Sequence, residues 1–206
     1  MKPQTQPDDA VFYLLAGPNG AGKSTLYRSA VADGLIPLEA EFVNADLYEA
    51  EHLQHVADAQ IRSGQARQWA DARRAALLGF GLSFVSETVF SHPSKLALIE
   101  DAQKKGFAVV LLVVCLDDPK RLLQRVAQRV QEGGHAVPAN RILARYPRTL
   151  KNLAQAVRMA DIALLFDTGG TVKNGVNRPV RVAVCRSGNT RLLSNKLPLW
   201  VTLVLG

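Results

Sequence analysis

The sequence has few cysteines, no long hydrophobic run and no hydrophobic leader. The two cysteines, Cys115 and Cys185, each lie inside an apolar stretch, which favours buried thiols in a reducing compartment over a disulfide framework. The longest apolar run, Phe107 to Leu116, is too short to cross a bilayer. The start of the chain, Met1 to Asp9, is polar and carries prolines, unlike a signal peptide. We therefore expect a soluble, cytoplasmic protein with no membrane segment.

Aromatic residues are also scarce, at 6% of the chain, and most of them fall in predicted strands. The formal net charge of +7 indicates an anionic partner, which could be nucleic acid, a membrane surface or a phosphorylated small molecule. Single-strand nucleic-acid platforms interleave aromatic and basic residues, so the low aromatic content disfavours that partner. A hydrophobic content of 48% over 206 residues suits one α/β domain, predicted to cover residues 1–206.

The most informative motif is the stretch from Gly17 to Thr25, which reads GPNGAGKST and matches G-x-x-x-x-G-K-S. An apolar run at residues 10–16 precedes it as a predicted buried strand. A predicted helix at 24–31 follows and ends near Gly34. Strand, glycine-rich loop and helix N-terminus together form a site for the phosphates of a nucleotide. The residues predicted to bind the nucleotide are Gly17, Asn19, Gly20, Ala21, Gly22, Lys23, Ser24 and Thr25.

Two side chains of this loop have predicted chemical roles. Lys23 is expected to reach the β- and γ-phosphates, and the Ser24 hydroxyl is expected to ligate Mg²⁺. The motif by itself does not distinguish a kinase from a GTPase, a motor or a switch, so the choice depends on residues elsewhere in the chain.

Strands and helices alternate until about residue 170, which predicts a mainly parallel sheet with helices on both faces. This is the three-layer α/β fold of P-loop NTPases. Five strands are expected at 10–16, 41–44, 82–86, 107–116 and 161–166. Helices are expected at 47–59, at 64–79, from about 92 to 106, from 118 onward and at 141–159. The last part, about 171–206, is predicted to be a β extension: an antiparallel hairpin of 180–185 and 191–193, then a strand at 197–205.

Acidic residues follow two of the predicted strands. Asp46 is a candidate general base or metal contact, or alternatively the cap of a helix that starts at Leu47. Glu87 and Thr88 end the third strand, where Glu87 could hold substrate hydroxyls, pair with Mg²⁺, or be a plain strand-end residue. Ligands in such sheets bind at the carboxyl ends of the strands, so these side chains and the loop should converge.

Arginines on two predicted helices are candidates for binding phosphate. Arg125 and Arg129 lie four residues apart on one helix, and a glycine-rich break containing Gly133, Gly134 and His135 follows. Three more arginines come next, at 141, 145 and 148. This pattern predicts a lid at about 120–150 that closes over phosphates, and the alternative is two solvated helix faces.

The ordered set of these blocks resembles the zeta-toxin family of P-loop kinases over residues 10–168. The blocks are GPNGAGKST at 17–25, FVNAD at 42–46, FVSET at 84–88, RVAQRV at 125–130, GGHAVP at 133–138 and RY at 145–146. The resemblance implies an adenylate-kinase-like fold and ATP with Mg²⁺ as phosphate donor. It also implies a UDP-N-acetylglucosamine 3′-hydroxyl as acceptor and a possible antitoxin protein as partner.

By the same resemblance, Lys23 is the phosphate lysine, Asp46 the catalytic base, Glu87 a substrate contact and Arg125 a phosphate-stabilising arginine. Arg129 competes with Arg141 and Arg145 for the role of the family's second arginine, because the family's lid arginine falls near Gly134 and His135 here. The leading hypothesis is an ATP-dependent kinase acting on a small hydroxyl substrate. The rival hypothesis is a nucleotide-gated ATP-binding protein whose ATP-bound form is recognised by a protein partner.

Overall fold

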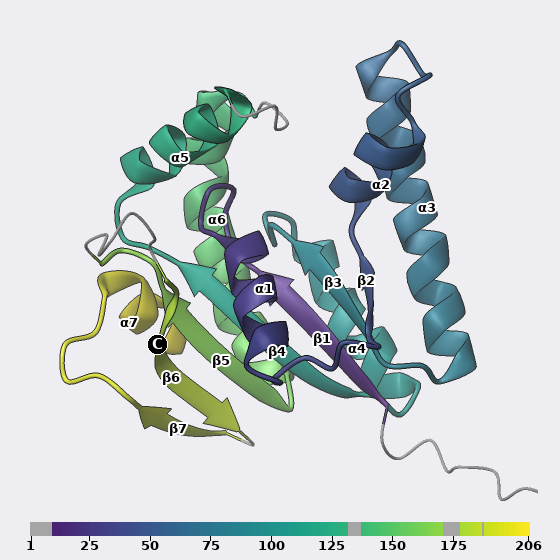
Figure 1. Cartoon of the computed structure of the whole chain (residues 1–206). Helices are drawn as coiled ribbons and strands as arrows, with labels where there is room; N and C mark the ends of the chain where they lie inside the picture. Colours follow the sequence, from purple (N-terminus) through teal and green to yellow (C-terminus); the bar gives the residue numbers. More distant parts are fainter. Residues whose placement is uncertain (1–9, 132–136, 171–177, 187) are drawn as a thin grey trace, which may run out of the picture.

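A single mixed sheet runs through the molecule, in the order β2-β3-β1-β4-β5-β6-β7 (Figure 1). The computed structural model describes residues 10–131, 137–170, 178–186 and 188–206. Strands β1 to β5 are parallel, and β6 and β7 add an antiparallel hairpin to the β5 edge. The strands are β1 Val11–Ala16, β2 Glu41–Val43, β3 Phe84–Thr88, β4 Ala108–Cys115, β5 Ile162–Asp167, β6 Val180–Arg186 and β7 Asn189–Leu192.

Helices connect the parallel strands, as the alternating pattern predicts. They are α1 Lys23–Ala32, α2 Ala45–His52, α3 Ala59–Phe80, the short 3-10 helix η2 Pro93–Leu96, α4 Ala97–Lys104, α5 Pro119–Gln131, α6 Ala139–Met159 and α7 Leu199–Leu205. No helix in the described parts of the chain is long and apolar enough to span a membrane. The helical regions agree with prediction except at the two places described next.

The final segment is a helix and not the predicted strand. Residues 199–205 form α7, in which Trp200, Val201 and Val204 are buried at the i, i+1 and i+4 spacing of a helix face. The β-branched residues in this run favour a strand locally, but packing against the core decides the conformation. The C-terminal extension is therefore a hairpin followed by a helix.

The helix predicted at 47–59 ends earlier, at His52, and the helix predicted at 64–79 begins earlier, at Ala59. Helix α2 ends at His52, and α3 starts at Ala59 after the Asp58 carboxylate caps it by accepting from the N–H groups of Gln60 and Ile61. Gly81, in the left-handed conformation, then ends α3. Capping residues that were not recognised in the sequence therefore set the bounds of these helices.

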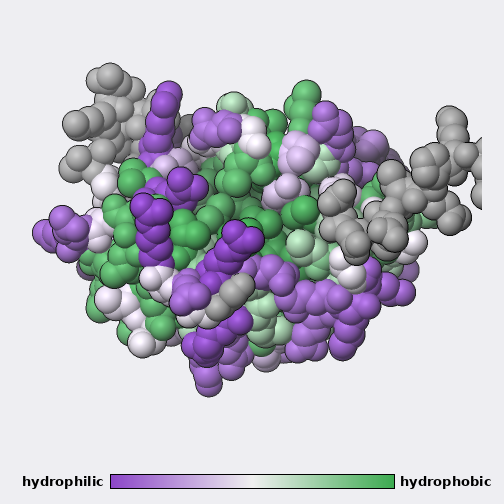
Figure 2. Space-filling model, turned by 90° about the horizontal axis from the view of Figure 1, so that it is seen from below, coloured by the Kyte–Doolittle hydropathy of each residue, from purple (hydrophilic) through white to green (hydrophobic). Residues whose placement is uncertain are grey.

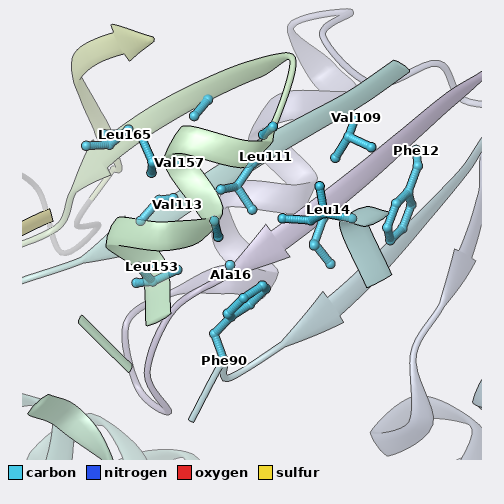
Figure 3. Packing of buried hydrophobic residues seen from close by; sticks show 14 of the residues in the cluster. Phe12, Leu14, Ala16, Phe90, Val109, Leu111, Val113, Leu153, Val157 and Leu165 are labelled. Atoms are coloured by element: carbon cyan, nitrogen blue, oxygen red, sulfur yellow. The ribbon is translucent and has the colours of Figure 1, made fainter. Parts of the chain in front are cut away.

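Two apolar clusters, one on each face of the sheet, make a three-layer arrangement. One cluster joins strand residues such as Phe12, Leu14 and Leu111 to α3, α4, α6 and α7 (Figure 3). The other joins Leu15 and Leu112, from the opposite face, to α1 and α5. This alternation along each parallel strand confirms the predicted α/β fold. The helical pairs α2–α3 and α5–α6 extend beyond the carboxyl ends of the strands (Figure 1).

The underside of the molecule, where β1 begins, carries hydrophobic surface in its middle with hydrophilic residues around it (Figure 2). The large exposed hydrophobic side chains of the described residues include Phe80 and Leu82, beside the start of β3. Neither residue is among the predicted site residues, all of which lie toward the carboxyl ends of the strands.

Candidate functional site

The phosphate-binding loop lies between β1 and α1, as predicted. Its glycines allow close approach by two other elements. A Cβ on Gly17 would lie 2.0 Å from the Val114 carbonyl oxygen of β4, and one on Gly20 would lie 2.6 Å from the Leu122 carbonyl oxygen of α5. Gly20 also has a positive φ of 81°. The loop is therefore held tightly between β4 and α5, and larger residues are excluded from both positions.

Lys23 is the first residue of α1, and its ammonium group folds back over the loop. Its Nζ donates to the carbonyl oxygens of Gly17 at 3.1 Å and Pro18 at 3.3 Å. The same atom lies 3.7 Å from Oε1 of Glu87. Only 7% of Lys23 is exposed, so its charge is held close to a partly buried carboxylate. The predicted convergence of Lys23 and Glu87 is therefore present.

Asn44 links Glu87 to the start of α2, and sequence reasoning gave it no role. Its side-chain Nδ2 donates to Oε2 of Glu87 at 3.4 Å, and its Oδ1 accepts from the N–H groups of Asp46 at 2.9 Å and Leu47 at 3.3 Å. Asn44 is therefore the N-cap of α2, which begins at Ala45. The alternative in which Asp46 caps a helix beginning at Leu47 is wrong.

Asp46 lies in the first turn of α2 and is exposed. Within the described residues, no hydrogen bond or ion pair to its carboxylate is present. The Asn44 bonds nevertheless bring the backbone N–H of Asp46 and the Glu87 carboxylate to opposite ends of one amide side chain. The structure thus joins Lys23, Glu87 and the segment that carries Asp46 through consecutive contacts, and leaves the Asp46 carboxylate open to a ligand.

Thr88 and the residues after it are fixed by backbone contacts and by α6. The Thr88 carbonyl oxygen accepts from Gly17 N–H at 3.3 Å, and its hydroxyl accepts from Phe90 N–H at 3.3 Å. Phe90 is fully buried with a φ of +61°, which is unusual for a bulky residue (Figure 3). Thr149 and Asn152 of α6 donate to the carbonyl oxygens of residues 89 and 90. These contacts support the turn that follows Glu87.

Arg125 contacts the back of the phosphate-binding loop. Its guanidinium donates to the Gly20 carbonyl oxygen at 3.4 Å and to the hydroxyl and carbonyl oxygens of Thr168 at 3.0 and 2.7 Å. Burial, followed by the nearby charge of Arg121, lowers the pKa of Arg125, and Asp167 acts in the opposite direction. Arg121 itself donates to the carbonyl oxygens of Gly169 and Gly170. Sequence reasoning missed this turn at 167–170.

The other predicted lid arginines lie farther along α5 and α6. Arg129 is on the exposed side of α5, Arg145 is half-buried, and Arg148 donates to the Ala144 carbonyl oxygen of its own helix. Arg141 is exposed near the start of α6. The predicted hinge of Gly133, Gly134 and His135 lies outside the described residues. Arg125 donates to the Gly20 carbonyl oxygen of the loop at 3.4 Å.

Partly buried Tyr146, on α6, and buried Cys115, the last residue of β4, are two titratable groups near the end of β4. The Tyr146 hydroxyl of α6 donates to the Leu116 carbonyl oxygen at 2.8 Å, and burial raises the pKa of this phenol. Burial likewise raises the pKa of the Cys115 thiol to about 12. Tyr146 therefore remains a neutral donor that fastens α6 to the end of β4.

Several solved structures have folds similar to that of this chain. A chain from the PezAT chromosomal toxin–antitoxin system of Streptococcus pneumoniae aligns with a TM-score of 0.60 and 15% identity, over 77% of this chain and 68% of that one. A chain from the AvrRxo1-ORF1:-ORF2 complex with ATP aligns with a TM-score of 0.68 and 18% identity, over 90% and 61%. A putative kinase from Chloroflexus aurantiacus aligns with a TM-score of 0.53 and 18% identity, over 69% and 78%. At these identities the likeness establishes the fold.

Sequence comparison identifies the family. No curated protein sequence matches this chain. A family model described as Zeta toxin, however, matches residues 1–177 of the 206. That match covers the phosphate-binding loop, Asn44, Asp46, Glu87 and the α5–α6 region, so the chain belongs to the zeta-toxin family of phosphotransferases.

Proposed function

We propose that this protein is an ATP-dependent kinase that transfers the γ-phosphate of ATP to a hydroxyl group of a small molecule. The observation that carries the proposal is the buried ammonium of Lys23, held between the phosphate-binding loop and Glu87, with the open carboxylate of Asp46 on the adjoining segment. Phosphoryl transfer needs a cation on the transferring group and an acid–base group at the acceptor. Family membership and an ATP-bound structural neighbour add support.

The loop residues would bind the nucleotide first. Backbone N–H groups between Asn19 and Thr25 would surround the β- and γ-phosphates, and Lys23 would exchange part of its contact with Glu87 for phosphate oxygens. Ser24 is exposed on the first turn of α1, and its hydroxyl oxygen is a hard donor suited to Mg²⁺. That ion, when bound, would neutralise charge on the phosphates.

The chemical step would then require proton removal from the acceptor. Asp46 would accept the proton of the substrate hydroxyl as the oxygen forms a bond to the γ-phosphorus, and the bond from that phosphorus to the β–γ bridging oxygen would break. Glu87 and Thr88 would hold other hydroxyls of the acceptor. Arg125 and Arg129, from α5, would stabilise the charge of the transferred group once the nucleotide is present.

The acceptor that we propose is the 3′-hydroxyl of the sugar in UDP-N-acetylglucosamine, on the basis of the family resemblance. A protein inhibitor is proposed as partner, because one matched structure comes from a toxin–antitoxin system. Neither proposal changes the assignment of the phosphate-binding loop, so each is tested separately from the transfer reaction.

The deciding experiment is incubation of the purified full chain with ATP, Mg²⁺ and UDP-N-acetylglucosamine, followed by mass spectrometry of the small molecules. We expect a product heavier by one phosphate, absent with a Lys23→Ala variant that retains a native circular dichroism spectrum. No transfer to this acceptor, with transfer to another sugar hydroxyl, would correct the substrate alone. ATP binding without transfer to any hydroxyl acceptor tested would overturn the kinase proposal and favour a nucleotide-gated binding protein.

A further inference from the structure

The C-terminal helix α7 lies outside the segment that the family model matches, yet it is part of the core. Trp200 and Val201 are fully buried, and Val204 is 1% exposed. The carboxylate of Asp117, which follows β4, accepts from the backbone N–H groups of Leu199 at 2.9 Å and Trp200 at 2.7 Å. A side chain at the carboxyl end of the sheet therefore fixes the beginning of this helix.

The indole of Trp200 makes a directed contact to the end of β5. Its Nε1–H donates to Oδ1 of Asp167 at 2.9 Å, and the other carboxylate oxygen of Asp167 accepts from Gly169 N–H at 2.9 Å. A hydrogen bond to a charged acceptor is stronger than one between neutral groups. The Asp167 carboxylate is thus held by the helix on one side and holds the turn at 167–169 on the other.

Thr168, between these two residues, connects the turn to the phosphate-binding loop. It is 2% exposed, and its hydroxyl donates to the Ala21 carbonyl oxygen at 2.9 Å. The same hydroxyl and the Thr168 carbonyl oxygen accept from Arg125 at 3.0 and 2.7 Å. A Cβ placed on Gly22 would contact the Thr168 methyl group at 3.7 Å. The turn therefore touches both the loop and the arginine that reaches it.

We propose that Trp200 is a positioning residue for ATP binding, which acts through Asp167 and Thr168 on the phosphate-binding loop and Arg125. This inference rests on the proposed function. Without the indole N–H, the Asp167 carboxylate loses a buried donor, so the turn shifts to find water or another partner. Because the turn is bonded directly to Ala21 and Arg125, the shift changes the geometry of the loop.

The competing interpretation is that Trp200 only fills the core, since buried indoles usually find a hydrogen-bond partner. Trp200→Phe separates the two, because it keeps an aromatic ring and removes the N–H. The matched control is Val204→Ala, which truncates a buried side chain of the same helix with no bond to the turn. Each variant is assayed for thermal midpoint and for the ATP dissociation constant by calorimetry, below its unfolding range.

We expect Trp200→Phe to weaken ATP binding about tenfold, as for loss of one hydrogen bond to a charged group. Val204→Ala should lower the thermal midpoint and leave the dissociation constant unchanged. Thr168→Val removes the hydroxyl farther along the same path, and it should weaken binding similarly. The double variant of Trp200 and Thr168 should then bind hardly worse than either single variant.

Wild-type ATP affinity in Trp200→Phe would overturn the inference and leave the proposed function intact. The same conclusion would follow if Val204→Ala weakened ATP binding as much as Trp200→Phe does. If Trp200→Phe does not fold, Thr168→Val decides by the same criterion. Absence of ATP binding by the wild-type chain would instead overturn the proposed function together with this inference. The dissociation constant needs no acceptor, so an incorrect choice of acceptor does not affect the test.

Discussion

Asp46 differs from its acidic neighbour Glu87 in having an exposed carboxylate with no bonded partner in the described residues. Glu87 is committed to Lys23 and Asn44, whereas Asp46 is available to accept a proton. We expect Asp46→Asn to lower kcat by about 10² to 10⁴, the usual contribution of a general base, and to leave the ATP dissociation constant unchanged. Steady-state kinetics with the identified acceptor and calorimetry with ATP would measure the two quantities.

Glu51→Gln is the control for that variant, because Glu51 lies on the same helix and is exposed. It removes one negative charge without removing the proposed base. Retention of wild-type kcat in Asp46→Asn would reject the assignment. Equal losses in both variants would show that the charge of α2, and not a proton acceptor at Asp46, matters for turnover.

Because the Cys115 thiol is buried, we expect the free energy of unfolding to depend on pH. Burial raises the pKa of its thiol from 9.0 to about 12. Between these pH values the unfolded chain releases a proton that the folded chain keeps, so the free energy of unfolding falls as pH rises. The limit is about 1.4 kcal/mol per pH unit. Urea unfolding of wild type and Cys115→Ala at several pH values above 8 should show a steeper decline for wild type, and parallel slopes would contradict the prediction.

At the scale of residues, the sequence predicts the position of the glycine-rich loop and its approach to Glu87, whereas several other contacts around the loop carry no local signal. The glycine-rich motif predicts a phosphate-binding loop because its spacing has one well-known backbone use. Thr168 and Trp200 carry no such local signal, since the contacts of their side chains come from segments distant in the sequence. The Asn44–Asp46 spacing did hold a clue, because Asn followed two residues later by Asp is a good helix N-terminus.

At the scale of elements, α2 depends on Asn44 for both its cap and its link to β3. Asn44→Ala should lower the free energy of unfolding by about 1 kcal/mol, the usual cost of losing an N-cap. Asn44→Asp keeps a capping oxygen but has no N–H to donate to Glu87, and it places two carboxylates together. We therefore expect near-normal capping in Asn44→Asp, and weaker turnover in both variants.

Urea denaturation and steady-state kinetics on the three proteins would test this separation. Full activity in Asn44→Asp would mean that the contact to Glu87 has no role in positioning the site. Normal stability in Asn44→Ala would mean that water replaces the cap at no cost. Either result would be informative about α2 alone, because Lys23 and its two loop carbonyl contacts do not involve Asn44.

The type of an element, helix or strand, was predictable wherever its hydrophobic periodicity agreed with the turn or capping residues at its ends. The valine-rich run before Cys115 predicts a strand buried on both faces, and β4 is that strand. The last helix was mistaken because its short apolar run suits either conformation. Its helical form depends on the Asp117 cap and on packing by Trp200, both of which come from the tertiary structure.

At the scale of the whole molecule, the sheet extends past the family-matched segment. The five parallel strands were predicted, as was the hairpin, and the hairpin joins the same sheet through β5. Buried residues of this extension, including Val182 and Ala183, belong to the same apolar cluster as β1 and β4. We therefore propose that residues 1–206 are one folding unit, and that the C-terminal extension at about 171–206 folds as part of the same core.

This proposal predicts that a chain ending at residue 177, where the family match ends, does not fold natively. Truncation there would uncover the β5 edge and remove six residues of the core cluster, among them Val182, Trp200 and Val204. Burial of each large side chain contributes about 1.5–3 kcal/mol. The combined loss is therefore comparable with the whole free energy of unfolding of a typical domain. Near-ultraviolet circular dichroism and urea titration should show no cooperative transition for the truncated chain and one transition for the full chain. Cooperative unfolding of residues 1–177 would show that the extension is dispensable for folding, because the remaining core would then be sufficient by itself.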